Sequence, residues 1–414
     1  MKPLKRARLL FAAVPLLAGF IAGCGDFWQA PSTTTSTGGC TTNCTTATSG
    51  NFYILDSGNN PGIVGNVVNA GTLDAITGSP WLLSTLGASG APYSMAIAPN
   101  GNYLVVSTTS GVFSFPITNG VPGAATLVSE VEAFAIQVDA GSGWILEAIP
   151  GTAGVEVDAV PVDSTTGASP GNAQTQSYTV ANGSLQLNQM AVAGDDSYIF
   201  LAMGTGGTVV VPFNLNVASG GNPLSATGTI IKVANTGGSA SSVAVDPVTT
   251  ANATPRLFYI GEALGNSAGT SGGLRVFNYS SLGGTITQAA GSPVASGGLS
   301  PTYILPLATG TYANEYVYVA NGQGTAAGNV SGFTITASTA TTPVYTVATD
   351  TSTATGEQPL GLAEDSSGQF VFEVGSAGSP YFDAYTFDST VLGQLDSQLV
   401  ATASGNAVAI VAAP

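Results

Sequence analysis

A short β-strand unit recurs along the chain from residue 51 onwards. Each copy has an apolar strand, a polar turn and a second strand rich in aromatic or β-branched residues, a pattern typical of antiparallel strands. A third strand follows after a turn containing Gly or Ser. The first two strands of the six complete copies occupy residues 95–106, 134–148, 190–202, 243–261, 303–320 and 361–374, and the third strands begin at residues 111, 154, 207, 272, 330 and 381.

A seventh copy is divided between the two ends of the chain. "AVAIVAA" (407–413) resembles a first strand, and "NFYILDSGN" (51–59) with "GIVGNVVNAG" (62–71) resembles the strands that should follow it. A ring closed in this way leaves no free sheet edge. The 55 Gly and 23 Pro residues argue against long helices. We therefore predict an all-β, seven-bladed β-propeller, with another all-β ring or a sandwich as the alternatives.

The N-terminus has the features of an export signal. Four basic residues precede a 13-residue apolar run from Leu9 to Ile21, which is too short to span a bilayer. Residues Ile21 to Cys24 resemble the lipobox of bacterial lipoproteins; the alternative is a hydrophobic helix with an incidental cysteine. The resemblance implies cleavage before Cys24 and acylation of its thiol, which would anchor the protein at the cell envelope, in the periplasm or on the outer surface.

The expected domains are a signal peptide (1–23), a flexible Ser/Thr/Gly-rich tether (24–50) and the propeller (51–414). Within the tether, Cys40 and Cys44 are close enough to form a local disulfide in an oxidising compartment, although free thiols are equally compatible with the sequence. The chain contains no histidine and no second cysteine pair, so a thiolate metal site is not expected there.

The charge of the chain limits its partners. Removal of residues 1–23 leaves three basic against 23 acidic residues, a formal charge of about −20. Nucleic acid is therefore excluded as a partner, because phosphate neutralisation requires clustered Lys and Arg. Charged residues are only 7% of the chain, so hydroxyl and amide groups must solvate the surface. A monomer is expected.

Two motifs resemble those of a known family. The turn in "APNGNYLVV" (98–106) and the segment "YVYVAN" (316–321) are similar to motifs of the lactonase-type seven-bladed propellers, which include the 6-phosphogluconolactonase-like and YVTN-repeat proteins. The resemblance covers residues 51–414. It implies the propeller fold and, for some members, opening of sugar lactones. Enzymes of this kind are expected to place His, Arg or Glu at the central channel, and this chain has no histidine.

Few residues are candidates for chemistry. Lys232, Arg256 and Arg275 are the only cations beyond the signal peptide. One of the two arginines is a candidate for binding an anionic group; the alternative is that each caps a strand edge or pairs with a nearby acid. Gly-x-Ser-x-Gly occurs at 167–171 and 265–269, but a nucleophile elbow also needs a following helix and a histidine base. No residue is assigned a catalytic role.

Calcium is the one metal that the available ligands suit, because only oxygen donors remain. Asp195–Asp196 and Glu364–Asp365 are adjacent acidic pairs in predicted turns, where Asp also serves to bond its own backbone. Scattered acids are further candidates for a central Ca²⁺ site, namely Asp56, Asp139, Glu147, Glu262 and Glu373. No metal or other cofactor is assigned.

Two functional hypotheses follow. The first is a membrane-tethered, non-catalytic propeller that binds a protein or a glycan at the cell envelope. The second is a lactone hydrolase that acts on a neutral substrate, with Ca²⁺ or a carboxylate polarising the lactone carbonyl.

Overall fold

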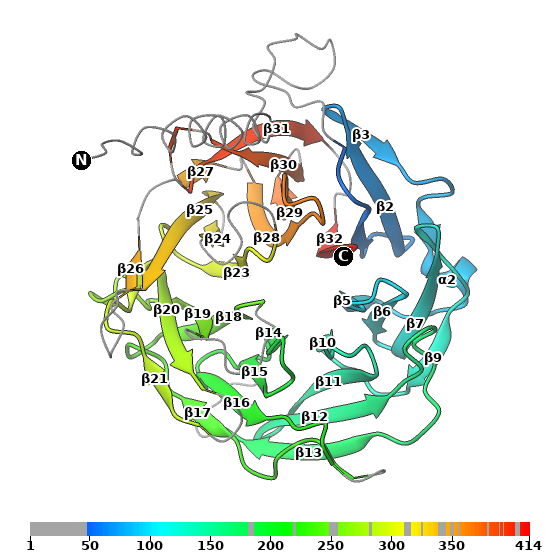
Figure 1. The fold of residues 1–414 in the computed structure, drawn as a ribbon, viewed down its shortest axis with the longest axis horizontal. Coiled ribbons are helices and arrows are strands. Elements are labelled where there is room, and N and C mark those ends of the chain that lie inside the picture. The colour runs from blue at the N-terminus through cyan, green and yellow to red at the C-terminus, as the bar shows by residue number, and fades with distance from the viewer. Residues whose placement is uncertain are drawn as a thin grey trace, which may run out of the picture.

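Seven β-sheets surround a central axis in the computed structural model (Figure 1). The structure describes residues 48–414 except 181–185, 218–220, 248–255, 281–283, 310–315, 324–325, 338–344, 348–351, 355–356, 379–380, 389, 392 and 402–405. The arrangement confirms the predicted all-β, seven-bladed propeller. The signal peptide, most of the tether, and Cys24, Cys40 and Cys44 lie outside the described residues.

Each blade is an antiparallel sheet whose strands run outward from the axis in chain order. Blade 1 contains β5 (Pro92–Ile97), β6 (Tyr103–Thr108), β7 (Gly111–Thr118), β8 (Val121–Pro122) and β9 (Thr126–Ser129). Blade 2 contains β10 (Ala135–Val138), β11 (Trp144–Gly151), β12 (Gly154–Pro161) and β13 (Gln174–Thr179). Blade 3 contains β14 (Gln189–Val192), β15 (Tyr198–Ala202), β16 (Thr208–Pro212) and β17 (Thr229–Ile231).

The remaining blades follow the same plan. Blade 4 contains β18 (Ser239–Val245), β19 (Leu257–Ala263), β20 (Gly273–Tyr279), β21 (Ile286–Gln288) and β22 (Val294–Ala295). Blade 5 contains β23 (Pro301–Pro306), β24 (Tyr316–Gln323), β25 (Ala326–Ala337), β26 (Tyr345–Val347) and β27 (Ser352–Ala354). Blade 6 contains β28 (Glu357–Glu364), β29 (Val371–Gly378), β30 (Phe382–Phe387) and β31 (Leu395–Ala401).

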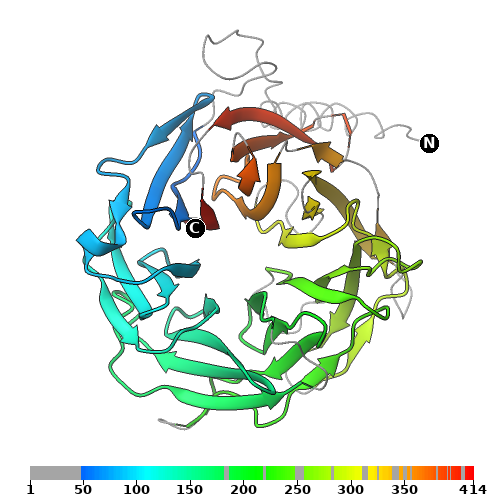
Figure 2. The same cartoon turned by 180° about the vertical axis from the view of Figure 1, so that it is seen from behind.

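Blade 7 closes the ring with strands from both ends of the chain. It contains β32 (Ala407–Ala412), β1 (Phe52–Asp56), β2 (Gly62–Asn69), β3 (Thr72–Ala75) and β4 (Trp81–Leu82), and the short helix α2 (Leu83–Leu86) leads into blade 1. β32 pairs antiparallel with β1, with Phe52 opposite Ala412 and Leu55 opposite Ala409. The C-terminal strand thus lies beside β1 at the inner edge (Figure 2). The predicted split blade is confirmed.

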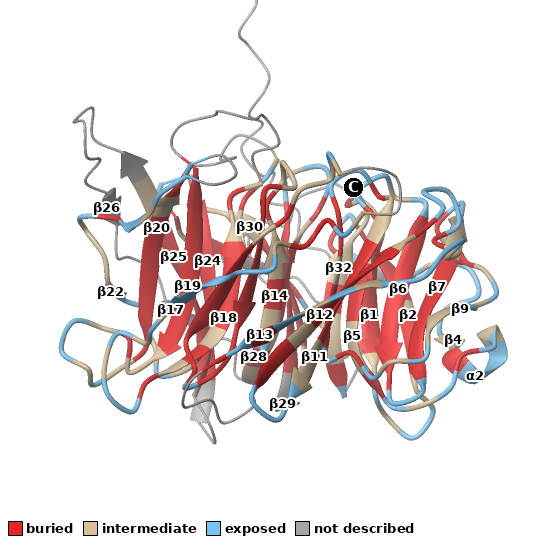
Figure 3. Cartoon of the chain, turned by 90° about the horizontal axis from the view of Figure 1, so that it is seen from below, coloured by how far each residue is buried: buried red, intermediate tan, exposed pale blue. Residues whose placement is uncertain are grey.

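The hydrophobic core lies between the blades rather than at the axis. Strand residues are buried along most of their length, while the connections at the two rims are exposed (Figure 3). Phe52 of blade 7 stacks on Phe372 of blade 6, with ring centroids 4.2 Å apart. Phe200 of blade 3 stacks on Phe258 of blade 4 at 4.4 Å. The faces of adjacent blades pack on one another, and this is why they are apolar.

Polar side chains join the inner strands of neighbouring blades. Gln137 Nε2 donates to Met190 O at 3.2 Å, Gln189 Oε1 accepts from Val243 N at 3.1 Å, and Thr302 Oγ1 donates to Pro359 O at 2.7 Å. These bonds satisfy backbone groups on the edges that face the axis, groups that would otherwise rely on water.

The antiparallel order gives the ring two different faces. The face named here the turn face carries the turn between the first and second strand of each blade, such as the Asn-Gly turn at Gly101, whose φ is +74°. The face named the entry face carries the starts of the inner strands, the connections from one blade to the next, and the turns between second and third strands. Among the described residues, no helix combines the length and the apolar character needed to cross a bilayer.

Candidate functional site

The acidic pair of the blade 3 turn connects three blades. Asp195 forms an ion pair with Arg256, and both side chains are buried. The Arg256 guanidinium also lies over the ring of Tyr279, 5.1 Å from its centroid. Asp196 Oδ1 accepts a hydrogen bond from Ala140 N in the blade 2 turn at 2.9 Å, and burial raises its pKa to about 6. The expectation that Arg256 pairs with a nearby acid is confirmed.

The acidic pair of the blade 6 turn is equally engaged. Glu364 accepts from Ala308 N at 2.6 Å and from Thr309 N at 3.0 Å, both in the preceding blade. Asp365 accepts from Phe370 N at 2.9 Å within its own turn. Glu364 therefore fastens neighbouring blades together, and Asp365 performs the turn-stabilising role expected of Asp at such positions.

The five scattered acids do not converge on the axis. Asp56 accepts from Gly58 N, and Asp139 accepts from Gly143 N and Trp144 N in the blade 2 turn. The other three occupy the second strands of blades 2, 4 and 6 and are fully buried, namely Glu147, Glu262 and Glu373. Among the described residues, no three His, Cys, Asp or Glu side chains are grouped so that they could hold a metal ion.

Glu147 lies in a buried polar cluster between blades 1 and 2. Ser129 Oγ is 2.8 Å from its Oε1 and 2.7 Å from its Oε2, and Asp158 stands directly opposite on β12. Burial raises the pKa of Glu147 to about 8; the Ser129 hydrogen bond opposes this shift and the Asp158 charge adds to it. This raised pKa favours the protonated, neutral form of Glu147. With no exposed surface, it is enclosed by the two blades.

The two Gly-x-Ser-x-Gly serines both donate to backbone carbonyls. Ser169 Oγ donates to Gly171 O at 2.8 Å, and Ser267 Oγ donates to Pro293 O at 3.1 Å. Neither motif connects a strand to a helix. The nucleophile-elbow geometry, in which a strained turn presents the hydroxyl to a base, is therefore not built at either site.

A cavity of about 570 Å³ opens between blades 3 and 4 at the entry face. It is lined by the segment that leads from β17 into β18, by the turn between β19 and β20, and by polar side chains from both blades. Its polar lining includes Lys232, Asn235, Asn266, Ser267, Arg275 and Gln288. Two of the three cations beyond the signal peptide thus share one cavity, although 43 positions separate them in the chain.

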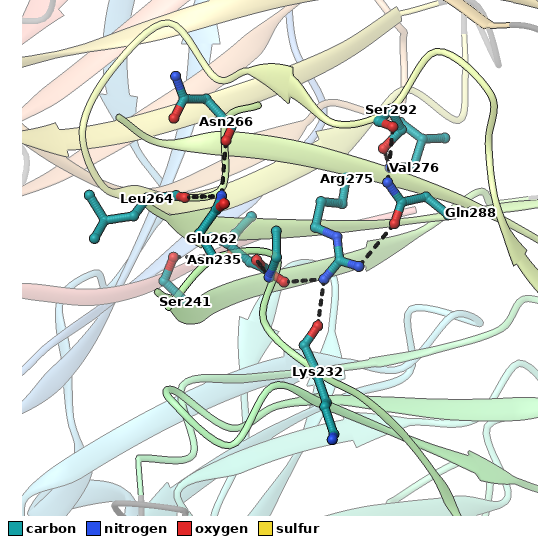
Figure 4. Close-up of polar contacts among 12 residues, drawn as sticks. Lys232, Asn235, Ser241, Glu262, Leu264, Asn266, Arg275, Val276, Gln288 and Ser292 are labelled. Atoms are coloured by element: carbon teal, nitrogen blue, oxygen red, sulfur yellow. Dashed lines mark hydrogen bonds and ion pairs between the residues drawn. The ribbon is translucent and has the colours of Figure 1, made fainter. Parts of the chain in front are cut away.

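Arg275 is held by three acceptors in this cavity (Figure 4). Its Nη1 donates to Lys232 O at 2.8 Å and to Glu262 Oε1 at 2.6 Å, while Nη2 donates to Gln288 Oε1 at 3.0 Å. Glu262 Oε2 also accepts from Ala234 N at 2.7 Å. The guanidinium is therefore oriented before any ligand arrives, and Nη2 keeps a second hydrogen besides the one given to Gln288.

The backbone around the cavity is fixed by Asn235. Its Nδ2 donates to Leu264 O at 2.7 Å and to Asn266 O at 2.9 Å, which joins the segment from blade 3 to the turn of blade 4 (Figure 4). The Lys232 side chain is exposed, in contrast with the 9% exposure of the Arg275 side chain. The cavity thus offers one buried, oriented cation and one exposed cation, beside amide and hydroxyl groups.

The "YVYVAN" segment has a structural role in blade 5. Asn321, its last residue, is fully buried on β24. Its Oδ1 accepts from Ser296 Oγ at 2.8 Å and its Nδ2 donates to Ser296 O at 2.9 Å. The side chain therefore fixes the connection between blades 4 and 5 to β24, the second strand of blade 5. An amide suits this position because it can both accept and donate a hydrogen bond.

Comparisons with known proteins support the fold. No family model matches the chain, and no curated protein matches its sequence. A candidate 6-phosphogluconolactonase from Bacteroides uniformis superposes with a TM-score of 0.63 at 14% identity, covering 87% of this chain and 98% of that chain. A periplasmic gluconolactonase from Pseudomonas aeruginosa has a TM-score of 0.59 at 14% identity, covering 89% and 100%.

A functionally unknown protein from Desulfotomaculum acetoxidans is similar to the same degree, with a TM-score of 0.59 at 12% identity over 87% of this chain and 98% of that one. At such identities the likeness concerns the fold alone. The predicted resemblance is confirmed at that level: the chain shares the seven-bladed propeller fold of the 6-phosphogluconolactonase-like lactonases.

Proposed function

We propose that the protein is a lipid-anchored propeller of the bacterial cell envelope that binds a small ligand without transforming it. The observation that carries this proposal is the cavity between blades 3 and 4, in which three acceptors hold the Arg275 guanidinium in place. A preformed site of this kind avoids the entropy cost of ordering its side chains on binding.

The chemistry of the cavity favours a ligand with one carboxylate and several hydroxyl groups. Glu262 neutralises Arg275, so the exposed ammonium of Lys232 supplies the one net positive charge. The surrounding charge of about −20 opposes anions at long range, but salt screens it beyond ~8 Å. A singly charged ligand is therefore compatible with the cavity, and a doubly charged phosphate is less so.

The topology suits a tethered receptor. The described chain begins at Thr48, which bridges to Asn69 at the turn face. The cavity lies at the opposite, entry face. A lipid anchor attached through residues 24–47 would therefore reach the propeller from the side away from the cavity and leave the cavity open to the surroundings.

Replacement of the lipid acceptor tests the anchor. We expect Cys24→Ser to move the protein from the membrane fraction to the soluble fraction, because a thioether-linked acyl anchor cannot form on serine. Cell fractionation followed by detection of the propeller measures this. Cys40→Ser serves as the matched control and should leave the protein in the membrane fraction. Membrane retention of Cys24→Ser would contradict lipid anchoring at this residue.

Lactone hydrolysis is the alternative function. Two structural neighbours, a candidate 6-phosphogluconolactonase and a periplasmic gluconolactonase, favour it. Residues for the reaction would have to be found outside the acids described above, since Glu147 is enclosed and Glu262 is bound to Arg275 and Ala234 N. The two functions differ in whether the ligand is chemically changed.

Binding and turnover can be measured on the same preparation. We expect purified protein to bind gluconate, an acid with one carboxylate, and to release no acid from neutral or phosphorylated lactones, with Ca²⁺ or with chelator. Lys232→Gln should weaken gluconate binding by about tenfold, the effect of losing ~1.4 kcal/mol from a charge-assisted hydrogen bond. Isothermal titration calorimetry and pH-stat assays give the two readouts.

Asn172→Asp is the matched control for charge. Asn172 is exposed in the connection between β12 and β13, away from the cavity, and its replacement changes the net charge by the same amount as Lys232→Gln. Equal loss of affinity in both variants would contradict binding in the cavity. Lactone turnover well above the buffer rate would replace the binding proposal with the hydrolase.

A further inference from the structure

An aromatic pair is exposed where the inner strands of blades 1 and 2 begin. The rings of Tyr93 and Phe134 stack with centroids 4.6 Å apart and planes inclined by 15°. Phe134 is 40% exposed. Every other stacked pair that the structure describes joins rings buried between blades, such as Phe52 and Phe372. The Tyr93–Phe134 pair is therefore not part of the buried core, and the exposure of Phe134 requires another explanation.

A β-bulge directs Tyr93 towards blade 2. The pairing of β5 with β6 shifts between Pro92 and Ser94, so that Tyr93 is the extra residue. β18 and β23 have bulges at the corresponding place, and the extra residues there are Ser241 and Thr302. Both donate a hydroxyl hydrogen bond to the inner strand of the next blade. Bulges re-aim side chains, and in blade 1 the re-aimed side chain is an aromatic ring rather than a hydroxyl.

The surroundings of the pair are fixed and acidic. Phe134 N donates to Ala148 O at 3.0 Å, and the neighbouring Ala133 is fully buried, so the backbone of this connection is anchored. The exposed carboxylate of Glu132 accepts a hydrogen bond from the Tyr93 hydroxyl. Glu130, also exposed, lies two residues earlier. A flat apolar surface is thereby combined with carboxylate acceptors.

We propose that Tyr93, Phe134 and Glu132 form a binding site for a neutral saccharide. The C–H groups of a pyranose carry partial positive charge and pack on the negative face of an aromatic ring. Its hydroxyl groups would donate to the carboxylate oxygens of Glu132, since an ionised carboxylate only accepts hydrogen bonds. The few polar groups beside the apolar surface fix the orientation of the ring.

The local charge selects among saccharides. Glu130 and Glu132 would repel the carboxylates of uronic acids and the phosphates of phosphorylated sugars, and no cation beyond the signal peptide lies in blades 1 and 2. Uncharged hexose chains meet no such repulsion. The site lies at the entry face, as the cavity between blades 3 and 4 does, but it is formed by different blades and does not depend on that cavity.

Calorimetric titration with neutral hexasaccharides tests the proposal. Full-length protein is purified in a detergent without a sugar head group and titrated with maltohexaose, cellohexaose and mannohexaose, with tri-galacturonate as the anionic probe. We expect binding of at least one neutral probe and none of tri-galacturonate. Phe134→Ala should weaken that binding at least tenfold, and Glu132→Gln should weaken it less, because an amide still accepts hydrogen bonds.

Leu299→Ala is the matched control. Leu299 is 54% exposed in the connection between blades 4 and 5 at the same face, so its replacement removes a similar apolar surface elsewhere and should leave saccharide binding unchanged. Lys232→Gln should also leave it unchanged, which separates this site from the cavity. Failure of all three neutral probes to bind at millimolar concentration, or unchanged binding by Phe134→Ala, would overturn the proposal.

Discussion

A chain that ends at Asn406 is expected to lose cooperative folding of the whole propeller. The missing residues include β32, the inner strand of blade 7, which pairs with β1 on one side of the closure. β32 also lies against β28 of blade 6 and β5 of blade 1. Its removal would therefore expose two inter-blade surfaces and the edge of a strand, β1, whose residues 52–55 are fully buried.

The magnitude of this loss decides between local and global unfolding. Ile410 and Ala407 are buried in β32, and burial of the Ile410 side chain alone contributes about 1.5–3 kcal/mol. The lost backbone pairs and the exposed surface of Phe52 and Ile54 add to this. A domain is stable by only about 5–15 kcal/mol, so the loss is comparable to the total stability, and the open ring should not persist as a folded state.

Thermal denaturation followed by circular dichroism measures the effect. The control lacks only Pro414, an exposed residue beyond the last strand, and should melt as the full chain does. A synthetic peptide with the sequence of residues 405–414 should restore part of the cooperative melting transition of the shortened chain. The peptide can pair with the open edge of blade 7 as an added strand. Unchanged melting of the chain ending at Asn406 would show that β32 does not close the ring.

The fold was predictable because its main signal is local and repeated. The first two strands of blades 1 to 6, such as β5 with β6, are neighbours in the sequence and are joined by a single turn segment, so an apolar strand, a polar turn and an aromatic or β-branched strand identify them together. The seventh blade could be recognised because its two halves match that pattern separately. The sequence alone therefore predicts which segments form strands and how the two ends of the chain close the ring.

The polar contacts between blades were not predictable in the same way. Asp195 and Arg256 meet across two blades although 61 positions separate them, and the sequence showed only that Asp195 lies in a turn. The same limit applies to Lys232 and Arg275: the sequence identifies both as cations, but it does not show that they line one cavity. Tyr93 gave no signal, because a bulge of one residue depends on the packing of adjacent blades.

The stability of the propeller is expected to fall as the pH rises from about 5 to about 8.5. The chain has no histidine, so the groups that titrate in this range are chiefly buried carboxyls. Burial raises the pKa of Glu147 to about 8, that of Asp246 to about 7 and that of Asp196 to about 6. In each case the folded state binds its proton more tightly than the unfolded state does.

The direction of this pH dependence follows from the difference in proton affinity between the folded and the unfolded state. Stabilisation by Glu147 is complete below the ordinary pKa of 4.5 and is lost progressively until the pH passes about 8. Above that value the folded protein must hold an ionised Glu147 opposite Asp158, between blades 1 and 2. Each pKa unit corresponds to ~1.4 kcal/mol, so we expect this residue to remove roughly 2–4 kcal/mol from the free energy of unfolding at alkaline pH.

Glu147→Gln isolates the contribution of this one carboxyl. The amide imitates the protonated acid: its oxygen can accept from the Ser129 hydroxyl, and its nitrogen can donate to the same oxygen atom. Urea denaturation at pH 5 should therefore give nearly equal free energies of unfolding for the variant and the natural protein, whereas at pH 8.5 the variant should be the more stable. Glu130→Gln, a change at an exposed carboxyl, should leave the pH dependence as it is. If Glu147→Gln destabilised the protein equally at both pH values, Glu147 would have to be ionised throughout, and the pH dependence would have to arise from Asp246 and Asp196.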